Sequence, residues 1–184
     1  MTGEKRAEIL SNEKELQNID VVYTSNCVRT LQTAKYLLEK QNLKVNIDER
    51  FDERRPGKPN SDKVPDWYER QFFDENYKTE GGESQVEVRQ RMSEAFEEVV
   101  KDNKGKRIAI FSHGNAITFF LLKWCKLESV NINRNLCLSF NNKIVFNKRI
   151  NSPDVFKITL NDKNEVIDIE NIEFEDLDFD DFNK

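Results

Sequence analysis

The sequence is poor in the residues that build metal sites and disulfide frameworks. It has one histidine, His113, and three cysteines, Cys27, Cys125 and Cys137, among 184 residues. An odd number of cysteines with no pairing pattern excludes a disulfide framework, and these four side chains cannot form a Cys/His zinc site. We therefore expect no metal, no other cofactor and a reducing, cytoplasmic compartment.

The chain also lacks a long apolar run. The longest, Ala116 to Trp124, is interrupted by Lys123 and is far shorter than the ~20 residues that a membrane-spanning helix needs. Polar and charged residues follow Met1, so the start of the chain does not read as a signal peptide. Neither a Walker phosphate loop nor a GxGxxG motif is present. We expect no association with a membrane.

Negative charge is concentrated at the C-terminal end. Residues 173–184 hold six acidic residues and one lysine, which accounts for the whole net charge of −5. The rest of the chain, with 28 basic and 28 acidic residues, is neutral and offers no electrostatic footprint for nucleic acid. We predict one domain over residues 1–172 and a disordered acidic tail over 173–184. The apolar residues within the tail leave a docking segment as the alternative.

Helical and strand-like periods alternate along the chain. We predict helices over residues 3–17, from Asn26, from Pro65 after a loop, from a capping box at Ser84–Glu87, and over Asn115–Cys125. We predict strands at Asp20–Ser25, Val45–Asp48 and Arg107–Phe111. Three β-rich segments follow, at Leu136–Phe146, Val155–Leu160 and Val166–Ile172, with a turn at Asn161–Asn164 between the last two. This alternation predicts an α/β fold, a layered sandwich with a mostly parallel sheet and helices on both faces.

Two strand-to-helix corners carry side chains suited to a phosphate group. The first, residues 24–29, places Arg29 in the first turn of a helix, and the second, residues 112–115, places His113 and Gly114 before a helix. Carboxyl ends of parallel strands share one edge of the sheet, and a helix N-terminus there presents free N–H groups. Arginine offers a planar fork to phosphate oxygens, and glycine lets the backbone approach an anion closely.

Each candidate residue also has a structural interpretation. A histidine at a helix start is often a cap or a hydrogen-bonded core residue. Arg29 is also consistent with an ordinary exposed arginine. Glu53, in a cation-rich loop, is equally consistent with a surface ion pair. Taken one at a time, these residues leave both interpretations open.

Four segments in order resemble the histidine phosphatase superfamily over roughly residues 2–172. They are VYTSNCVRTLQTA at 22–34, FDERRPG at 51–57, GGES at 81–84 and FSHGN at 111–115. The resemblance implies the phosphoglycerate-mutase-like α/β fold, a three-layer sandwich, and a metal-independent reaction on a small phosphorylated metabolite. In that reaction one histidine attacks phosphorus and becomes phosphohistidine, a glutamate protonates the leaving oxygen, and water hydrolyses the intermediate.

The resemblance also implies roles for particular residues. Arg29 matches the phosphate-binding arginine, Glu53 the general acid, and His113 the second histidine, which steadies the transferring phosphoryl group in its charged form. Asn115 and Arg54 match positions that contact substrate in some mutase-type members of the family, and we expect Gly114 to contact the substrate as well. Only 27 residues, 54–80, separate Glu53 from the GGES segment, which favours a phosphatase over the alternative, a phosphoglycerate mutase.

The sequence departs from the family pattern at its start. Members of the family begin with a strand that ends in Arg-His-Gly, whose histidine is the nucleophile, and a unit of roughly 25–30 residues is missing here. We therefore expect the chain to be inactive as written. An upstream start site or a truncated sequence is the favoured explanation. A degenerate gene and a non-catalytic pseudoenzyme that binds phosphorylated ligands are the alternatives.

Overall fold

The structure is a computed structural model that describes residues 2–58, 67–131 and 133–174. The predicted tail lies outside the described residues from position 175 onward, and so do residues 59–66, which include Pro65 and the end of the loop before it. The helices are α1 (Gly3–Leu10), α2 (Val28–Gln41), α3 (Trp67–Phe73), α4 (Gln85–Asp102) and α5 (Gly114–Leu121), with short 3₁₀ turns η1 (Lys14–Leu16) and η2 (Glu49–Phe51). The strands are β1 (Val21–Thr24), β2 (Val45–Ile47), β3 (Ile108–Phe111), β4 (Lys126–Val130), β5 (Asn135–Phe140), β6 (Lys143–Arg149), β7 (Val155–Leu160) and β8 (Val166–Ile172).

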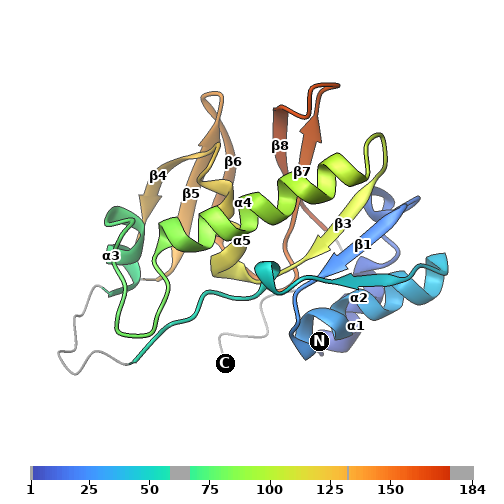
Figure 1. The fold of residues 1–184 in the computed structure, drawn as a ribbon, viewed down its shortest axis with the longest axis horizontal. Helices are drawn as coiled ribbons and strands as arrows, with labels where there is room; N and C mark the ends of the chain where they lie inside the picture. The colour runs from blue at the N-terminus through green and yellow to red at the C-terminus, as the bar shows by residue number, and fades with distance from the viewer. Residues whose placement is uncertain (1, 59–66, 132, 175–184) are drawn as a thin grey trace.

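A parallel sheet in the order β2-β1-β3 forms one half of the molecule. Its strands are short and apolar, and alternate side chains point to opposite faces. Val22 and Ala109 pair across β1 and β3 and pack with Leu37 of α2 on one face. Tyr23 and Ile110 belong to the larger core that α4 and α5 build on the other. The sheet therefore has a helical layer on each side, as predicted (Figure 1).

The C-terminal half corrects the expectation of a mostly parallel sheet. There β4, β5 and β6 form an antiparallel sheet, and β7 pairs with β8 in an antiparallel hairpin (Figure 1). The β-rich segment predicted over Leu136–Phe146 forms the hairpin of β5 and β6, in which Asn141 and Asn142 both have positive φ, 48° and 63°, as a tight hairpin turn requires. The predicted strands β7 and β8 are confirmed at both ends.

Two predicted helices are shorter than expected because local hydrogen bonds end them. After α1, Ser11 Oγ and Asn12 Nδ2 both donate to the carbonyl of Glu8. Because side chains bind this carbonyl, α1 ends at Leu10 and not at residue 17 as predicted. After α5, the amides of Lys123 and Trp124 donate to carbonyls three residues back, at 3.0 Å each. This tightening ends α5 at Leu121 rather than at Cys125.

Helix α4 begins where the capping box predicts. Ser84 Oγ accepts from the amide of Glu87, and the Glu87 carboxylate accepts from the amide of Ser84 at 2.9 Å. Its apolar face, with Val88 and Met92, packs into the main core together with Phe119 of α5. Within the described ranges, no helix has the length and apolar character that a membrane span requires.

Candidate functional site

The two predicted corners meet at the carboxyl ends of β1 and β3. The strands are parallel with Thr24 opposite Phe111, and the amide of Ser25 donates to the carbonyl of Phe111 at 3.0 Å. The chain then turns into α2 on one side and into α5 on the other. This geometry brings Arg29, at the start of α2, to His113, at the N-cap of α5.

His113 is buried, with 5% of its surface exposed, and both ring nitrogens have partners. Arg29 Nε donates to His113 Nδ1 at 2.8 Å, and His113 Nε2 lies 2.8 Å from Ser25 Oγ. Because a guanidinium can only donate, Nδ1 must be the acceptor, so the neutral ring carries its proton on Nε2 and donates it to Ser25. In this tautomer His113 donates to Ser25 and does not accept its hydroxyl proton.

The surroundings of His113 favour its neutral form. Burial, the largest cause, and the positive charges of Arg29 and Arg91 together lower its pKa to about 4, against the opposing charge of Asp52. At neutral pH the free site therefore holds an uncharged imidazole. The charged form that the family resemblance implies requires an added negative charge beside the ring, such as a bound phosphate.

A third segment, residues 48–55, joins the two corners. Asp52 Oδ1 accepts from the amide of Asn26 at 2.7 Å, and Ser112 Oγ donates to the carbonyl of Phe51 at 2.7 Å. Glu53 follows directly, and its Oε1 accepts from the amides of Arg54 at 2.9 Å and Ala116 at 3.1 Å. Ala116 is in the first turn of α5, so the Glu53 carboxyl group lies at the same helix N-terminus as His113.

Of the three predicted substrate-binding residues, two lie beside His113 in the first turn of α5 and the third, Arg54, lies in the loop after Glu53. Gly114 opens α5, where a Cβ would lie 3.2 Å from Cγ2 of Ile150, and Asn115 follows half-buried in the first turn. Arg54 is buried, and its Nε donates to the carbonyl of Glu83 at 2.8 Å. Among the described residues, no hydrogen bond or ion pair joins Arg54 to His113. Its burial lowers the pKa of Arg54, but an arginine stays charged at neutral pH.

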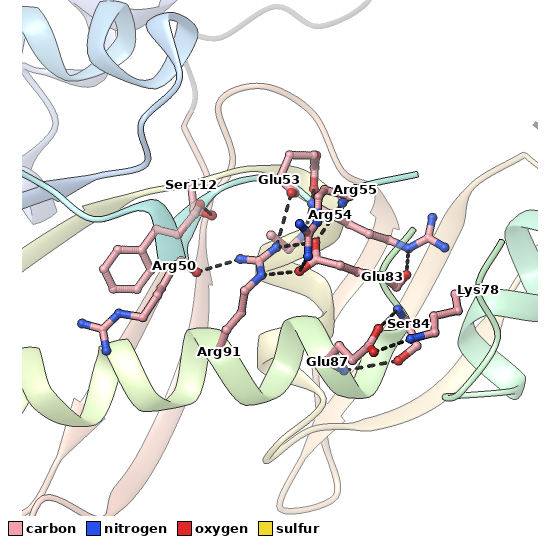
Figure 2. Close-up of polar contacts among 12 residues, drawn as sticks. Arg50, Glu53, Arg54, Arg55, Lys78, Glu83, Ser84, Glu87, Arg91 and Ser112 are labelled. Carbon is pink, nitrogen blue, oxygen red and sulfur yellow. Dashed lines mark hydrogen bonds and ion pairs between the residues drawn. The ribbon is translucent and has the colours of Figure 1, made fainter. Parts of the chain in front are cut away.

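Sequence reasoning missed several members of this site. Ser25 and Asp52 lie within the motif segments, but their contacts are visible only in the folded chain. Ser25 contacts the ring of His113, and Asp52 accepts from the backbone amide of Asn26. Arg91 lies in α4, and nothing in its local sequence distinguishes it from the other arginines of that helix. Figure 2 shows it reaching from α4 toward Arg50, Glu53 and Glu83.

The loop that carries Glu53 and Arg54 passes very close to the GGES segment. Lys58 donates its amide to the carbonyl of Glu80, and the amide of Glu83 donates to the carbonyl of Arg55, at 2.9 Å each. A Cβ at Gly57, where φ is +73°, would lie 2.6 Å from the amide nitrogen of Gly82. Only glycine fits this crossing of two backbones.

We expect Gly57→Ala to lower the free energy of unfolding more than Gly105→Ala. Both glycines have a left-handed φ, which costs a side chain about 1–2 kcal/mol, but a Cβ at Gly105 meets nothing within 4 Å. The clash at Gly57 adds roughly 1–3 kcal/mol. Urea unfolding of both variants measures the difference, and equal losses would contradict the close crossing.

The described residues hold no group of three or more His, Cys, Asp or Glu side chains placed to bind a metal ion. The three cysteines are free thiols. The polar groups at the ends of β1 and β3 are the Arg29 guanidinium, the His113 imidazole, hydroxyl groups, the carboxyl groups of Asp52 and Glu53, and a helix N-terminus. This combination suits a phosphate group.

Comparison with known proteins identifies the family. The sequence profile of the histidine phosphatase superfamily (branch 1) matches residues 1–144, so the chain belongs to this superfamily. It is 32% identical over 120 residues to phosphoserine phosphatase 1 of Hydrogenobacter thermophilus, a match over 60% of this chain and 56% of that protein. It is 29% identical over 123 residues to a probable phosphoglycerate mutase, GpmB, of Yersinia enterocolitica, over 62% of this chain and 57% of that protein.

The chain thus spans a little over half the length of these curated relatives. Among solved structures, it resembles a mycobacterial glucosyl-3-phosphoglycerate phosphatase in complex with inorganic phosphate. The TM-score is 0.58 at 21% identity, over 73% of this chain and 76% of that one. At this identity the likeness establishes the fold, which is the α/β fold of phosphoglycerate-mutase-like proteins.

Proposed function

We propose that this protein acts as a phosphomonoesterase of the histidine phosphatase type, on a small phosphorylated metabolite. The observation that carries the proposal is the meeting of Arg29 and His113, 2.8 Å apart, at the carboxyl ends of two parallel strands and at the start of α5. Arg29 would bind two oxygens of the phosphate, and the first amides of α5 would bind another. Gly114, Asn115 and Arg54 are the proposed contacts for the rest of the substrate.

Phosphoryl transfer depends mainly on positioning and on positive charge around the phosphate oxygens. A phosphate dianion that displaces the Arg29–His113 hydrogen bond would raise the pKa of His113, so that the charged imidazole could stabilise the transferring group. Glu53, at the same helix N-terminus, is the proposed acid that protonates the leaving oxygen. Membership of the superfamily fits both a phosphatase and a mutase. The short stretch from Glu53 to the GGES segment favours the phosphatase.

In this proposal His113 is the supporting histidine, and it is the only histidine of the 184 residues. The nucleophile of the family reaction is a second histidine, so we expect the 184-residue chain to bind phosphate without hydrolysing a phosphomonoester. A non-catalytic phosphate-binding protein is the alternative function with the same expected behaviour. Only the intact mass of the natural protein, with or without a preceding Arg-His-Gly segment, distinguishes the two.

The test combines a binding and a turnover measurement on the 184-residue chain. Calorimetric titration with inorganic phosphate should show binding that His113→Ala removes, and p-nitrophenyl phosphate should release no more product with the chain than with His113→Ala. Absence of phosphate binding would overturn the proposed site. Turnover that survives His113→Ala would remove His113 from the reaction, and turnover that depends on His113 would contradict the expected inactivity of the 184-residue chain.

A further inference from the structure

An ion pair next to the candidate site joins the buried Glu83 to the half-buried Arg91, and both side chains make further hydrogen bonds. Arg91 Nε donates to Glu83 Oε1 at 2.8 Å, and Arg91 Nη2 donates to Glu83 Oε2 at 3.1 Å. The same guanidinium donates from Nη1 to the carbonyl of Arg50 at 2.7 Å and from Nη2 to the carbonyl of Glu53 at 3.3 Å (Figure 2). Arg91 therefore ties the backbone of residues 50–53 to α4.

Glu83 holds the next residues of the same loop. Its Oε2 accepts from the amide of Arg55 at 2.9 Å, its backbone carbonyl accepts from Arg54 Nε at 2.8 Å, and its amide donates to the carbonyl of Arg55 at 2.9 Å. Only 5% of the Glu83 surface is exposed. Burial alone would raise the pKa of Glu83, but the bonds from Arg91 and from Arg55 lower it, so the carboxylate stays charged.

A contribution to the free energy of folding does not by itself explain the Glu83–Arg91 ion pair. Removing two charges from water is costly, and a buried ion pair is often no more stabilising than a pair of apolar side chains of similar volume. What the charged pair adds is direction, because a planar guanidinium and a carboxylate fix each other and the carbonyls that they contact. Here these directed bonds converge on residues 50–55, the loop that carries Glu53 and Arg54.

We propose that Glu83 and Arg91 are positioning residues that hold the Glu53 carboxyl group against the first turn of α5 and the Arg54 guanidinium beside it. The proposal rests on the proposed function for the role of Glu53 as the acid. The position of the Glu53 carboxyl group can be measured independently of that role, because the amide of Ala116 donates a hydrogen bond to it. That amide is the third of α5, it has no acceptor within the helix, and Glu53 Oε1 accepts from it at 3.1 Å.

Amide hydrogen exchange of Ala116, followed by NMR in the 184-residue chain, tests this positioning without any turnover. Arg91→Lys keeps the positive charge but loses the planar guanidinium that donates to both oxygens of Glu83. Glu83→Gln keeps the shape of the side chain but removes its negative charge. We expect Ala116 to exchange about tenfold faster in both variants, because a hydrogen bond to a charged acceptor is lost or weakened. The amide of Ile117, which donates to the carbonyl of His113 at 2.8 Å, should be unchanged.

Arg89→Lys is the matched control, since Arg89 lies on the same helix and pairs with Glu75 at 2.7 Å. Among the described residues, no hydrogen bond or ion pair joins its side chain to residues 50–55. Glu53→Ala gives the reference rate for an Ala116 amide without its acceptor. Unchanged Ala116 exchange in both test variants, with faster exchange in Glu53→Ala, would overturn the proposal. So would unchanged exchange in Glu53→Ala, equal acceleration of Ala116 and Ile117, or loss of the fold in both test variants. Failure of the proposed function would appear instead as absent phosphate binding.

Discussion

Arg29→Met is expected to weaken the binding of inorganic phosphate by at least about 100-fold. In the proposed complex Arg29 makes two charge-assisted hydrogen bonds to the phosphate, each of which contributes about 1.5–3 kcal/mol. Methionine fills similar space and offers no donor. The same substitution should raise the pKa of His113 above its value of about 4, because the charge of Arg29 is one of the causes that lower it. Calorimetric titration measures the affinity.

Arg107→Met is the control for this prediction. Arg107 directly precedes β3, at the end of the strand opposite to His113, and its Nη2 donates to the carbonyl of Glu15 at 2.7 Å. The variant changes the net charge by the same amount but removes no contact at the proposed site. We expect its affinity for phosphate to change less than about threefold, because exposed charges more than a Debye length apart are largely screened at physiological salt. Equal weakening in the two variants would contradict a direct contact with Arg29.

Phe119→Ala is expected to lower the free energy of unfolding by about 3–5 kcal/mol. Phe119 lies in α5, is fully buried and packs edge-to-face on Phe72 of α3 with ring centroids 5.3 Å apart. Alanine would leave a cavity where α3, α4 and α5 meet. Domains of this size are typically stable by only about 5–15 kcal/mol, so the variant should lose a large part of its stability.

Phe73→Ala controls for the loss of an aromatic ring. Phe73 is in α3 beside Phe72, but 70% of its surface is exposed. We expect its substitution to change the free energy of unfolding by less than about 0.5 kcal/mol, as for most surface positions. Urea unfolding followed by circular dichroism compares the two variants. A small loss for Phe119→Ala would contradict the packing of α5 described above, and with it the fixed position of the helix that His113 caps.

Much of the fold was predictable because local signals agree with the tertiary structure. The capping box at Ser84 marks the start of α4, and the turn at Asn161–Asn164 separates two strands whose ends are predicted correctly. Strand β4 was not predicted because Lys126–Val130 contains few apolar residues and shows no clear alternation of apolar and polar side chains. The direction of pairing in the C-terminal half was also missed, since it depends on a hairpin turn at Asn141–Asn142 rather than on periodicity.

The candidate site likewise contains residues that could be predicted from the sequence and residues that could not. His113 and Arg29 were predicted to lie at one edge of the sheet from the order of strands and helices, and the structure places them in contact. Their roles stay predictions. Arg91 and Glu83 could not be assigned from the sequence, because their effect on residues 50–55 comes from side chains that meet only after α4 packs against the loop. The neutral state of His113 was not predicted either, since it follows from burial beside two arginines.

Proton NMR of the imidazole of His113 tests the central claim most directly, because this is the only histidine and its signal needs no assignment. In the free protein the ring should titrate with a pKa of about 4. With saturating inorganic phosphate we expect the pKa to rise by about 1–3 units, as for a cation that gains an anion within hydrogen-bonding distance. A pKa that stays at its free value in phosphate would contradict a phosphate site at His113.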